Sequence, residues 1–325
     1  MALCLKQIAI SGGTGFVGRA LLTRLAVSQR IAVTAWVRAI PSQPLVTIQY
    51  LKQNVLESDD LLQGMMADLD VVIHAAARVH IMQDTSTDPL NDFRRVNVEG
   101  SLNLARHAAN AGVRRFVFIS SIKVNGECTK LGDSFSADDA PSPLDSYGVS
   151  KMEAENGLRD IAADTGMEVV IIRPPLVYGP GVKANFQTMM RWLSRGVPLP
   201  LGAINNKRSL VALDNLVDLI VTCIDHPAAT NQTFLVSDGE DLSTTQLLRR
   251  MGQAMGKPAR LIPVPPALLK AGAALVGKPE LAQRLCGSLQ VDISKTRELL
   301  GWSPPISVDE GLRRAAEGFR REAVV

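Results

Sequence analysis

Tyr147 and Lys151 are the residues of this sequence whose types and spacing most clearly suggest catalysis. They lie four positions apart at the start of residues 146–165, a segment predicted to be helical, so both side chains should share one helical face. A phenol with a pKa of about 10 is a poor acid or base at neutral pH, and a neighbouring ammonium is expected to lower that value. The pair can then move the proton of an alcohol oxygen while a nicotinamide moves a hydride. Taken alone, the spacing also fits an ordinary pair on a helix surface.

Ser120 and Ser121 close the apolar segment 115–120, which is predicted to be a strand. Sites in α/β proteins lie at the carboxyl ends of the strands. A hydroxyl there can hydrogen-bond the reacting oxygen and hold it against Tyr147. Serines after strands also form simple turns, and the position of this pair favours the catalytic interpretation.

A glycine-rich stretch near the N-terminus predicts a dinucleotide site. Residues 8–10 are apolar and predict a buried strand, and from Phe16 onward the apolar spacing becomes helical. Between them, Gly13, Gly15 and Gly18 satisfy the GxGxxG pattern in the strand–turn–helix context that gives it meaning. The turn needs residues without Cβ, and the helix N-terminus attracts a pyrophosphate. The expected cofactor contacts here are Gly12, Gly13, Thr14, Gly15, Phe16, Val17 and Gly18.

The second predicted strand, residues 31–37, bears on the choice of cofactor. Dinucleotide sites of this type usually place an acid near the end of this strand to bind the adenosine ribose. No Asp or Glu occurs before Glu57, whereas Arg38 follows the strand and Arg19 follows the third glycine. An arginine suits a 2′-phosphate, so we expect NADP(H) to be favoured over NAD(H). A solvated arginine is the alternative.

Strands and helices alternate along the first half of the chain. Residues 70–76 predict a buried strand ending in small alanines, in which His74 is expected to be a packed core histidine. A helix over residues 88–111 contains Asn97, and residues 167–173 predict a further strand. This alternation predicts an α/β fold with a doubly wound parallel sheet of the Rossmann type.

From Pro174 onward the pattern is less regular, and a smaller C-terminal α/β substrate domain is expected. We place the cofactor domain at residues 1–175, with about 210–236 returning to it, and the substrate domain in the remainder of 176–325. Within that remainder, residues 267–276 are apolar but short and contain Lys270. A helix packed on the domain core is expected there rather than a membrane-surface contact.

Composition excludes several classes of function. The chain of 325 residues is 46% hydrophobic and 21% charged with a net charge of +3, which gives no support for nucleic-acid binding. Its four cysteines and four histidines show no ligand spacing, so no metal is expected. No signal peptide and no apolar stretch of membrane-spanning length is found, so a cytoplasmic location is expected.

The chain resembles the extended short-chain dehydrogenases/reductases of the nucleotide-sugar epimerase/dehydratase group. The motifs SGGTGFVG, HAAA, NVEG, SSIKVNG, YGVSK, RPPLVYGPG, RSLVALDNLVD and DISKTRELLGW occur in that family's order over nearly the whole chain. The resemblance implies that Ser121, Tyr147 and Lys151 are catalytic, with Lys151 also holding the nicotinamide ribose. It implies that Asn185 and Arg208 contact the pyrophosphate of a nucleoside-diphosphate sugar, and it leads us to expect a homodimer.

Further contacts are expected for the cofactor and the substrate. For the cofactor they are Arg38, Asn54, Val55, Ala75, Ala76, Ala77, Asn97, Ser120, Tyr147, Lys151 and Pro174. For the substrate they are Val79, Ser121, Lys123, Asn185 and Arg208.

Two departures from the family pattern guide the expected reaction. Related epimerases usually carry Thr or Ser two residues after the catalytic serine and Tyr before the glycine, where this chain has Lys123 and Asn125. The acid pair of the dehydratases is absent. The segment SSIKVNGE and the NADP-like second strand resemble the 4-keto-reductases of bacterial deoxy-amino-sugar synthesis, and this resemblance implies a reductase acting at C4 of a UDP-linked 4-keto sugar. The alternative is a UDP-hexose 4-epimerase, acting on UDP-glucose or its N-acetylglucosamine counterpart, with tightly bound NAD.

Two further functions are less well supported. A redox sensor that binds dinucleotide without turnover would not need Tyr147 and Lys151. Reduction of a steroid-like or flavonoid-like carbonyl would not need Asn185 and Arg208.

Overall fold

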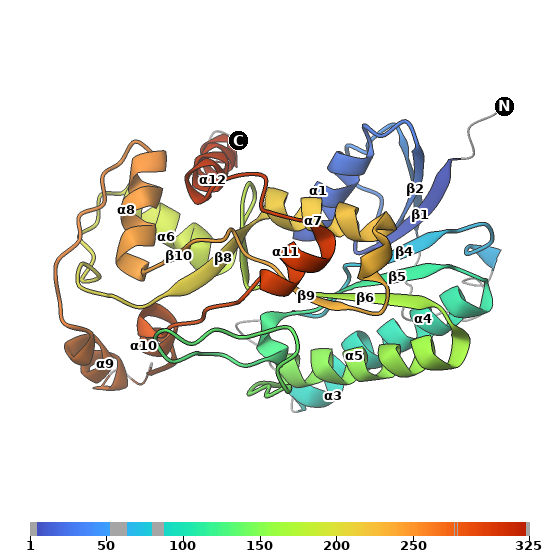
Figure 1. Ribbon diagram of the computed structural model, residues 1–325. Helices are drawn as coiled ribbons and strands as arrows, with labels where there is room; N and C mark the ends of the chain where they lie inside the picture. Colours follow the sequence, from blue (N-terminus) through green and yellow to red (C-terminus); the bar gives the residue numbers. More distant parts are fainter. Residues whose placement is uncertain (1–4, 53–63, 80–87, 276, 278, 323–325) are drawn as a thin grey trace.

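The computed structural model describes residues 5–52, 64–79, 88–275, 277 and 279–322, and shows a larger and a smaller lobe (Figure 1). Asn54 and Val55, two expected cofactor contacts, lie outside the described residues.

The larger lobe is built on a parallel sheet. Its strands are β1 (Lys6–Ser11), β2 (Ile31–Val37), β3 (Ile48–Lys52), β4 (Val71–His74), β5 (Arg115–Ile119), β6 (Glu168–Arg173) and β9 (Thr233–Leu235). Within the described residues this sheet has seven strands in the order β3-β2-β1-β4-β5-β6-β9. The order reverses between β1 and β4, and such a switch point opens a crevice at the carboxyl ends of the strands. The predicted doubly wound parallel sheet is confirmed.

Alternating side chains of each strand serve two separate cores. Ile8 and Ile10 of β1 belong to the core beneath α1 (Phe16–Leu25) and α7 (Leu213–Asp225), whereas Ala9 belongs to the core on the opposite face. Figure 1 shows α1 and α7 above the sheet, and α4 (Gly100–Asn110) and α5 (Ser146–Thr165) below it. Because both faces are covered, neighbouring residues in the middle of a strand are apolar on both faces, as Ile8, Ala9 and Ile10 are in β1.

The helices of the lower face carry the candidate site. The predicted helix over 88–111 is a continuous helical segment made of α3 (Pro89–Phe93), a π-helical turn η1 (Arg94–Glu99) and α4 (Gly100–Asn110). The predicted helix over 146–165 is α5 (Ser146–Thr165), which ends at Gly166 with a φ of +75°. A left-handed residue after the last turn is a common helix stop because glycine adopts it without strain.

The smaller lobe has a core of its own. Within the described residues its sheet has three strands, β7 (Leu176–Tyr178), β8 (Arg208–Ala212) and β10 (Asp241–Leu242), with β8 in the centre. Phe186, Leu248 and Leu312 are buried together in this core. The remaining elements are α6 (Ala184–Ser194), α8 (Thr244–Ala254), α9 (Pro266–Leu275), α10 (Pro279–Cys286), α11 (Ser294–Leu300), α12 (Val308–Glu322) and the short 3-10 turns η2 (Ile122–Val124) and η3 (Pro227–Ala229).

The expectation that residues 267–276 pack on the domain core is wrong. Residues 267–275 lie in α9 (Pro266–Leu275), which has no buried residue, and of its side chains only Leu269 packs, partly buried, against the lobe core; residue 276 lies outside the described residues. Among the described helices, none combines the length and the apolar character needed to cross a bilayer.

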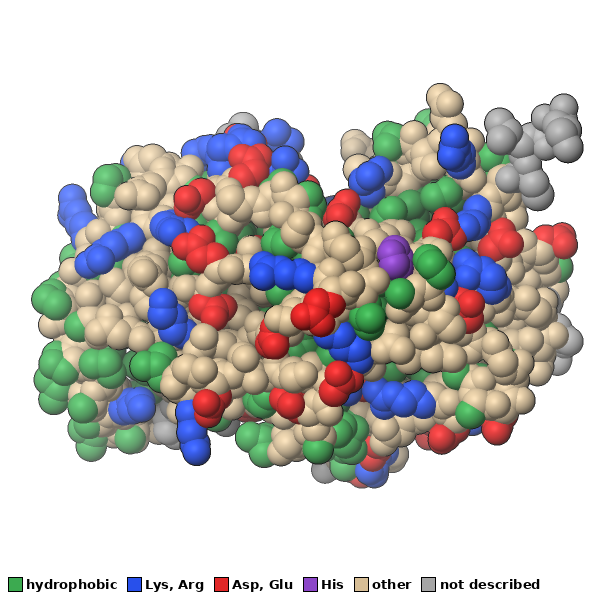
Figure 2. All heavy atoms as spheres, in the orientation of Figure 1, with side chains coloured by type: hydrophobic (Ala, Val, Ile, Leu, Met, Phe, Trp, Pro, Cys, Tyr) green, Lys and Arg blue, Asp and Glu red, His purple; other side chains and the backbone are tan. Residues whose placement is uncertain are grey.

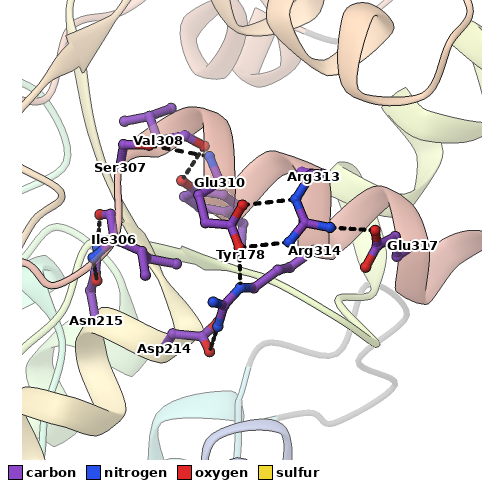
Figure 3. Close-up of polar contacts among 10 residues, drawn as sticks. All are labelled: Tyr178, Asp214, Asn215, Ile306, Ser307, Val308, Glu310, Arg313, Arg314 and Glu317. Carbon is purple, nitrogen blue, oxygen red and sulfur yellow. Dashed lines mark hydrogen bonds and ion pairs between the residues drawn. The ribbon is translucent and has the colours of Figure 1, made fainter.

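An ion pair fastens α12 to the larger lobe. Arg314 of α12 donates from Nη1 to Asp214 Oδ1 at 2.5 Å, at the start of α7, and from Nε to Glu310 Oε1 at 2.7 Å. Beside it, the Asn215 amide bonds both the N–H and the carbonyl of Ile306 (Figure 3). These contacts tie the C-terminal segment to the helix that covers the parallel sheet.

Candidate active site

The start of α5 lies against the segment that follows β5. Asp145 caps the helix by accepting a hydrogen bond from the Gly148 N–H at 2.7 Å. A Cβ on Gly148 would lie 2.8 Å from the Lys123 carbonyl oxygen, so only glycine allows the helix to approach this closely. The approach brings Tyr147 to Ser121, which follows β5.

The phenol of Tyr147 is held on two sides. Its oxygen shares a hydrogen bond with the Ser121 hydroxyl, and its ring meets the edge of the Phe93 ring with centroids 6.0 Å apart. Burial, followed by the negative charge of Asp145, raises the pKa of Tyr147 to about 12, and the Ser121 hydrogen bond opposes this rise. The structure thus joins two of the three expected catalytic residues directly.

Lys151 lies one turn further along α5 and is buried. Its ammonium donates to the Ile119 carbonyl oxygen at 2.9 Å and lies 4.4 Å from the centroid of the Phe118 ring. Burial lowers the pKa of Lys151 to about 7, against the opposing effect of Glu155.

The expected effect of Lys151 on the phenol is therefore not observed. Sequence spacing predicts that the ammonium lowers the pKa of Tyr147, but that pKa is raised. The reason is that burial dominates both groups, and the ammonium is directed at the end of β5 rather than at the phenol oxygen.

A buried polar network supports this end of the sheet. Glu155, fully buried on α5, accepts two hydrogen bonds from Arg173, Nε to Oε1 at 2.9 Å and Nη2 to Oε2 at 2.6 Å. Ser120 donates to the same carboxylate at 2.6 Å, and Arg173 also donates to Asn125 Oδ1 at 2.9 Å. The Ser120 hydroxyl, expected at the cofactor, is thus directed into this network.

Sequence reasoning missed Glu155 and Arg173, although two signals could have found them. Glu155 follows Lys151 by four residues and therefore shares its helical face. Arg173 follows four consecutive apolar residues of β6, and a charge at the buried end of such a run requires a buried partner.

The glycine turn fits the pyrophosphate of a dinucleotide. A Cβ on Gly18 would lie 2.2 Å from the Gly12 carbonyl oxygen, and one on Gly12 would lie 2.6 Å from the backbone nitrogen of Ala76. Gly15 precedes α1, and no side chain caps the first turn of that helix. Its amide groups are therefore available to an anion, together with the positive end of the helix dipole.

The segment after β4 lies beside the glycine turn, where the cofactor is predicted to bind. Ala75, Ala76 and Ala77 follow β4 and are partly exposed beside the glycine turn. Asn97, in the π-helical turn, accepts from the Arg78 N–H at 2.8 Å and donates to the Arg78 carbonyl and to the Ser150 hydroxyl, at 3.0 Å each. Asn97 therefore links this segment to α5.

His74 is a core histidine, as predicted. It is buried, it hydrogen-bonds the hydroxyls of Ser11 and Ser101, and its ring stacks on Phe118. Burial, aided by the charge of Lys151, lowers the pKa of His74 to about 3, so the ring is neutral at physiological pH.

The remaining predicted cofactor residues lie at different places. Arg38 is exposed after β2, and the buried Pro174 accepts from the Ile122 N–H through its carbonyl oxygen at 3.0 Å. Arg19 lies against Gly181 and lines a groove of about 600 Å³ between α1 and α7. Arg19 thus faces the smaller lobe.

The predicted substrate residues are spread over both lobes. Lys123 forms ion pairs with Asp145 and, at 3.1 Å, with Glu127. Val79 is 59% exposed after β4, and Asn185 is exposed in the first turn of α6.

Arg208 begins β8 and donates to the carbonyl oxygens of Arg284 and Gly287, at 3.0 and 3.2 Å. Burial lowers its pKa. Its guanidinium therefore supports the backbone near the end of α10. Within the described part of the chain, no group of acidic, histidine and cysteine side chains has the arrangement of a metal site.

Comparison with known proteins places this site in a family. The model of the NAD dependent epimerase/dehydratase family matches residues 8–237. UDP-glucose 4-epimerase of Vibrio cholerae is 49% identical over 316 residues, which is 97% of this chain and 95% of the relative.

Solved structures share the fold. A UDP-glucuronic acid 4-epimerase from Bacillus cereus, crystallised with NAD, has a TM-score of 0.77 at 20% identity and covers 97% of this chain and 99% of its own. A UDP-glucose 4-epimerase from Thermotoga maritima, crystallised with UDP-glucose, has a TM-score of 0.77 at 21% identity, with coverages of 98% and 99%. The chain therefore belongs to the NAD dependent epimerase/dehydratase family.

Proposed function

We propose that this protein is an NAD-dependent 4-epimerase of a UDP-linked hexose, with UDP-glucose as the first substrate to test. The observation that carries the proposal is the 49% identity to a UDP-glucose 4-epimerase over nearly the full length of both chains. The site agrees with it, because a phenol, a hydroxyl and an ammonium lie together beside a glycine turn suited to a dinucleotide.

The residues of this chain have separable roles in such a reaction. When bound at the glycine turn, the nicotinamide supplies reversible hydride transfer. Tyr147 takes the proton of the sugar C4 hydroxyl and returns it after the ring has turned over. Ser121, which already bonds the phenol, orients the sugar oxygen, and Lys151 holds a positive charge beneath the site.

The comparisons favour the epimerase over the 4-keto-sugar reductase that the sequence motifs suggested. They also favour NAD over NADP, although the exposed Arg38 guanidinium suits a phosphate. An epimerase returns the hydride that it removes, so it consumes no cofactor. A reductase consumes one NADPH for each sugar reduced.

The decisive experiment measures both reactions with one protein preparation. The purified protein is incubated with UDP-glucose without added cofactor, and UDP-galactose is followed by NMR. In parallel, NADPH absorbance is followed with a UDP-4-keto sugar, and the bound cofactor is identified after denaturation. Conversion of UDP-glucose and release of NAD are expected. Stoichiometric loss of NADPH without epimerisation would establish the reductase instead.

The Tyr147→Phe variant tests the mechanism. Removing the phenol oxygen should lower kcat by about 10²- to 10⁴-fold, because general acid–base catalysis supplies that range. Cofactor affinity, measured by fluorescence titration, should be nearly unchanged. Activity that survives the substitution would refute the role of Tyr147.

The roles of Asn185, Arg208, Lys123 and Val79 in holding the nucleotide sugar remain predictions. The homodimer, the domain boundaries and the cytoplasmic location also remain predictions.

A further inference from the structure

Helix α9 presents an apolar surface at the end of the smaller lobe. Its Leu268 and Leu275 are 64% and 90% exposed, and Ile262, in the segment leading to it, is 51% exposed. Ala267, Ala271 and Ala274 are exposed between them. We call these six residues the α9 surface. Figure 2 shows hydrophobic side chains gathered at the end of the smaller lobe where Figure 1 places α9. Exposed apolar patches of this kind usually mark a docking surface.

The stretch of sequence that leads into and contains α9 carries charges of one sign. From Leu242 to Leu275 the sequence contains five Lys or Arg and no Asp or Glu, whereas the whole chain has 35 basic and 32 acidic residues. Lys257, Arg260 and Lys270 are exposed and form no ion pair with any described residue. Elsewhere, two arginines of α12, Arg313 and Arg314, pair with carboxylates (Figure 3).

The geometry limits how such a surface can meet a bilayer. The ten residues of α9 extend over about 15 Å, whereas the hydrocarbon core of a bilayer is about 30 Å thick. The helix can therefore lie in the interface but cannot cross it. In Figure 1, α9 lies at the end of the molecule opposite β1 and α1, so a docked protein would keep its cofactor turn away from the lipid.

We propose that the α9 surface and its unpaired cations, Lys257, Arg260 and Lys270, dock the protein peripherally on a membrane containing anionic phospholipids. Exposed leucines enter the boundary between headgroups and acyl chains, and the cations meet lipid phosphates. A second copy of this chain would bring the same cations against one another, which disfavours self-association through this surface. The absence of acidic residues along this stretch favours a partner with an extended anionic surface, such as a bilayer.

The test uses the full-length protein and sucrose-loaded vesicles. Sedimentation is compared between vesicles of phosphatidylcholine alone and vesicles that also contain phosphatidylglycerol. Binding to the anionic vesicles is expected, and it should weaken as NaCl rises from about 50 mM to about 500 mM, because salt screens exposed charges. No binding, or equal and salt-independent binding to both vesicles, would overturn the proposal.

Matched variants separate the contribution of the exposed leucines to membrane binding from the contribution of the cations. Leu268→Ser with Leu275→Ser should lower the partition coefficient by roughly tenfold, and Lys257→Glu with Lys270→Glu by roughly 30-fold. The control replaces Leu131 and Leu144 by Ser, since these leucines are 68% and 69% exposed on other surfaces. The control should bind as wild type. All three variants should keep wild-type epimerase activity in solution and wild-type thermal unfolding, which shows that they fold.

Two further outcomes would refute membrane docking. If the control variant loses binding as strongly as the α9 variants, the effect is not specific to the α9 surface. If the protein forms a dimer that the Leu268 and Leu275 substitutions abolish, and no vesicle binding is seen, the surface joins two copies of the chain.

Discussion

Replacing Arg173 by Met should be among the most destabilising single changes in the larger lobe. The Arg173 side chain is buried with an exposed fraction of 2%, and it donates two hydrogen bonds to Glu155, whose side chain has an exposed fraction of 0%. Methionine fills much of the same volume without a charge. The substitution therefore leaves a buried carboxylate without its main counter-charge, and Asn125 loses a donor.

The expected loss can be estimated from these contacts. Removing one partner of a buried ion pair typically costs about 3–5 kcal/mol. Ser120 and Arg159 still donate to Glu155, so we place the loss near the lower limit, at about 3 kcal/mol. Arg159 is 43% exposed, and Arg159→Ala should cost at most about 1 kcal/mol, as exposed ion pairs do.

Equilibrium urea unfolding, followed by circular dichroism at a fixed NAD concentration, measures the free energies of unfolding. The double variant Arg173→Met with Glu155→Met removes both charges and should be more stable than Arg173→Met alone, with a coupling energy of about 2 kcal/mol. A loss below about 1 kcal/mol for Arg173→Met, or a double variant no better than the single one, would refute the view that an unpaired carboxylate causes the loss.

Three further predictions concern the catalytic helix and the glycine turn. Asp145→Asn keeps the helix cap but removes the charge that, after burial, raises the pKa of Tyr147. That pKa should fall, and the limb of the kcat/KM profile on which activity rises with pH, as the phenol ionises, should move to lower pH. An unchanged profile would contradict this. Burial lowers the pKa of Lys151 from 10.5 to about 7, so a charged Lys151 destabilises the folded state relative to the unfolded state. This destabilisation is complete below pH 7 and disappears as the pH rises to 10.5. Lys151→Met should therefore gain stability over wild type at about pH 6 and lose that gain at about pH 10.5 in urea unfolding, and a difference independent of pH would argue against it. Gly18→Ala should weaken NAD binding by roughly 10- to 100-fold in a fluorescence titration, because its Cβ would lie 2.2 Å from the Gly12 carbonyl oxygen. The control is Gly272→Ala, whose Cβ would have no atom within 4 Å. Equal NAD binding by the two variants would refute the steric argument.

Local patterns were sufficient to predict most of the larger lobe. The strand 31–37 and the helix 146–165 occur with the predicted bounds, because an unbroken apolar run and an Asp cap with a closing glycine are signals contained in a few adjacent residues. The helix over 88–111 was also predicted, but its π-helical turn was not. That turn places Asn97 against Arg78 and Ser150, and these partners lie far from Asn97 along the chain.

The pKa values of the site residues depend on contacts that the spacing of residues along the sequence does not reveal. Tyr147 and Lys151 are one turn apart, yet the phenol bonds Ser121 and the ammonium bonds the Ile119 carbonyl oxygen. Burial then shifts both pKa values against their charged forms. The exposure of α9 was likewise unpredictable, since an apolar helix carries no local mark of whether a partner covers it.

The sequence by itself determined most strands and helices of the larger lobe, the glycine turn and the types of the candidate catalytic residues, because each depends on neighbours within a few positions. Only the tertiary structure decided which charges are paired, buried or exposed. Burial and pairing depend on residues brought together from distant parts of the chain, such as Arg173 with Glu155 and Arg314 with Asp214.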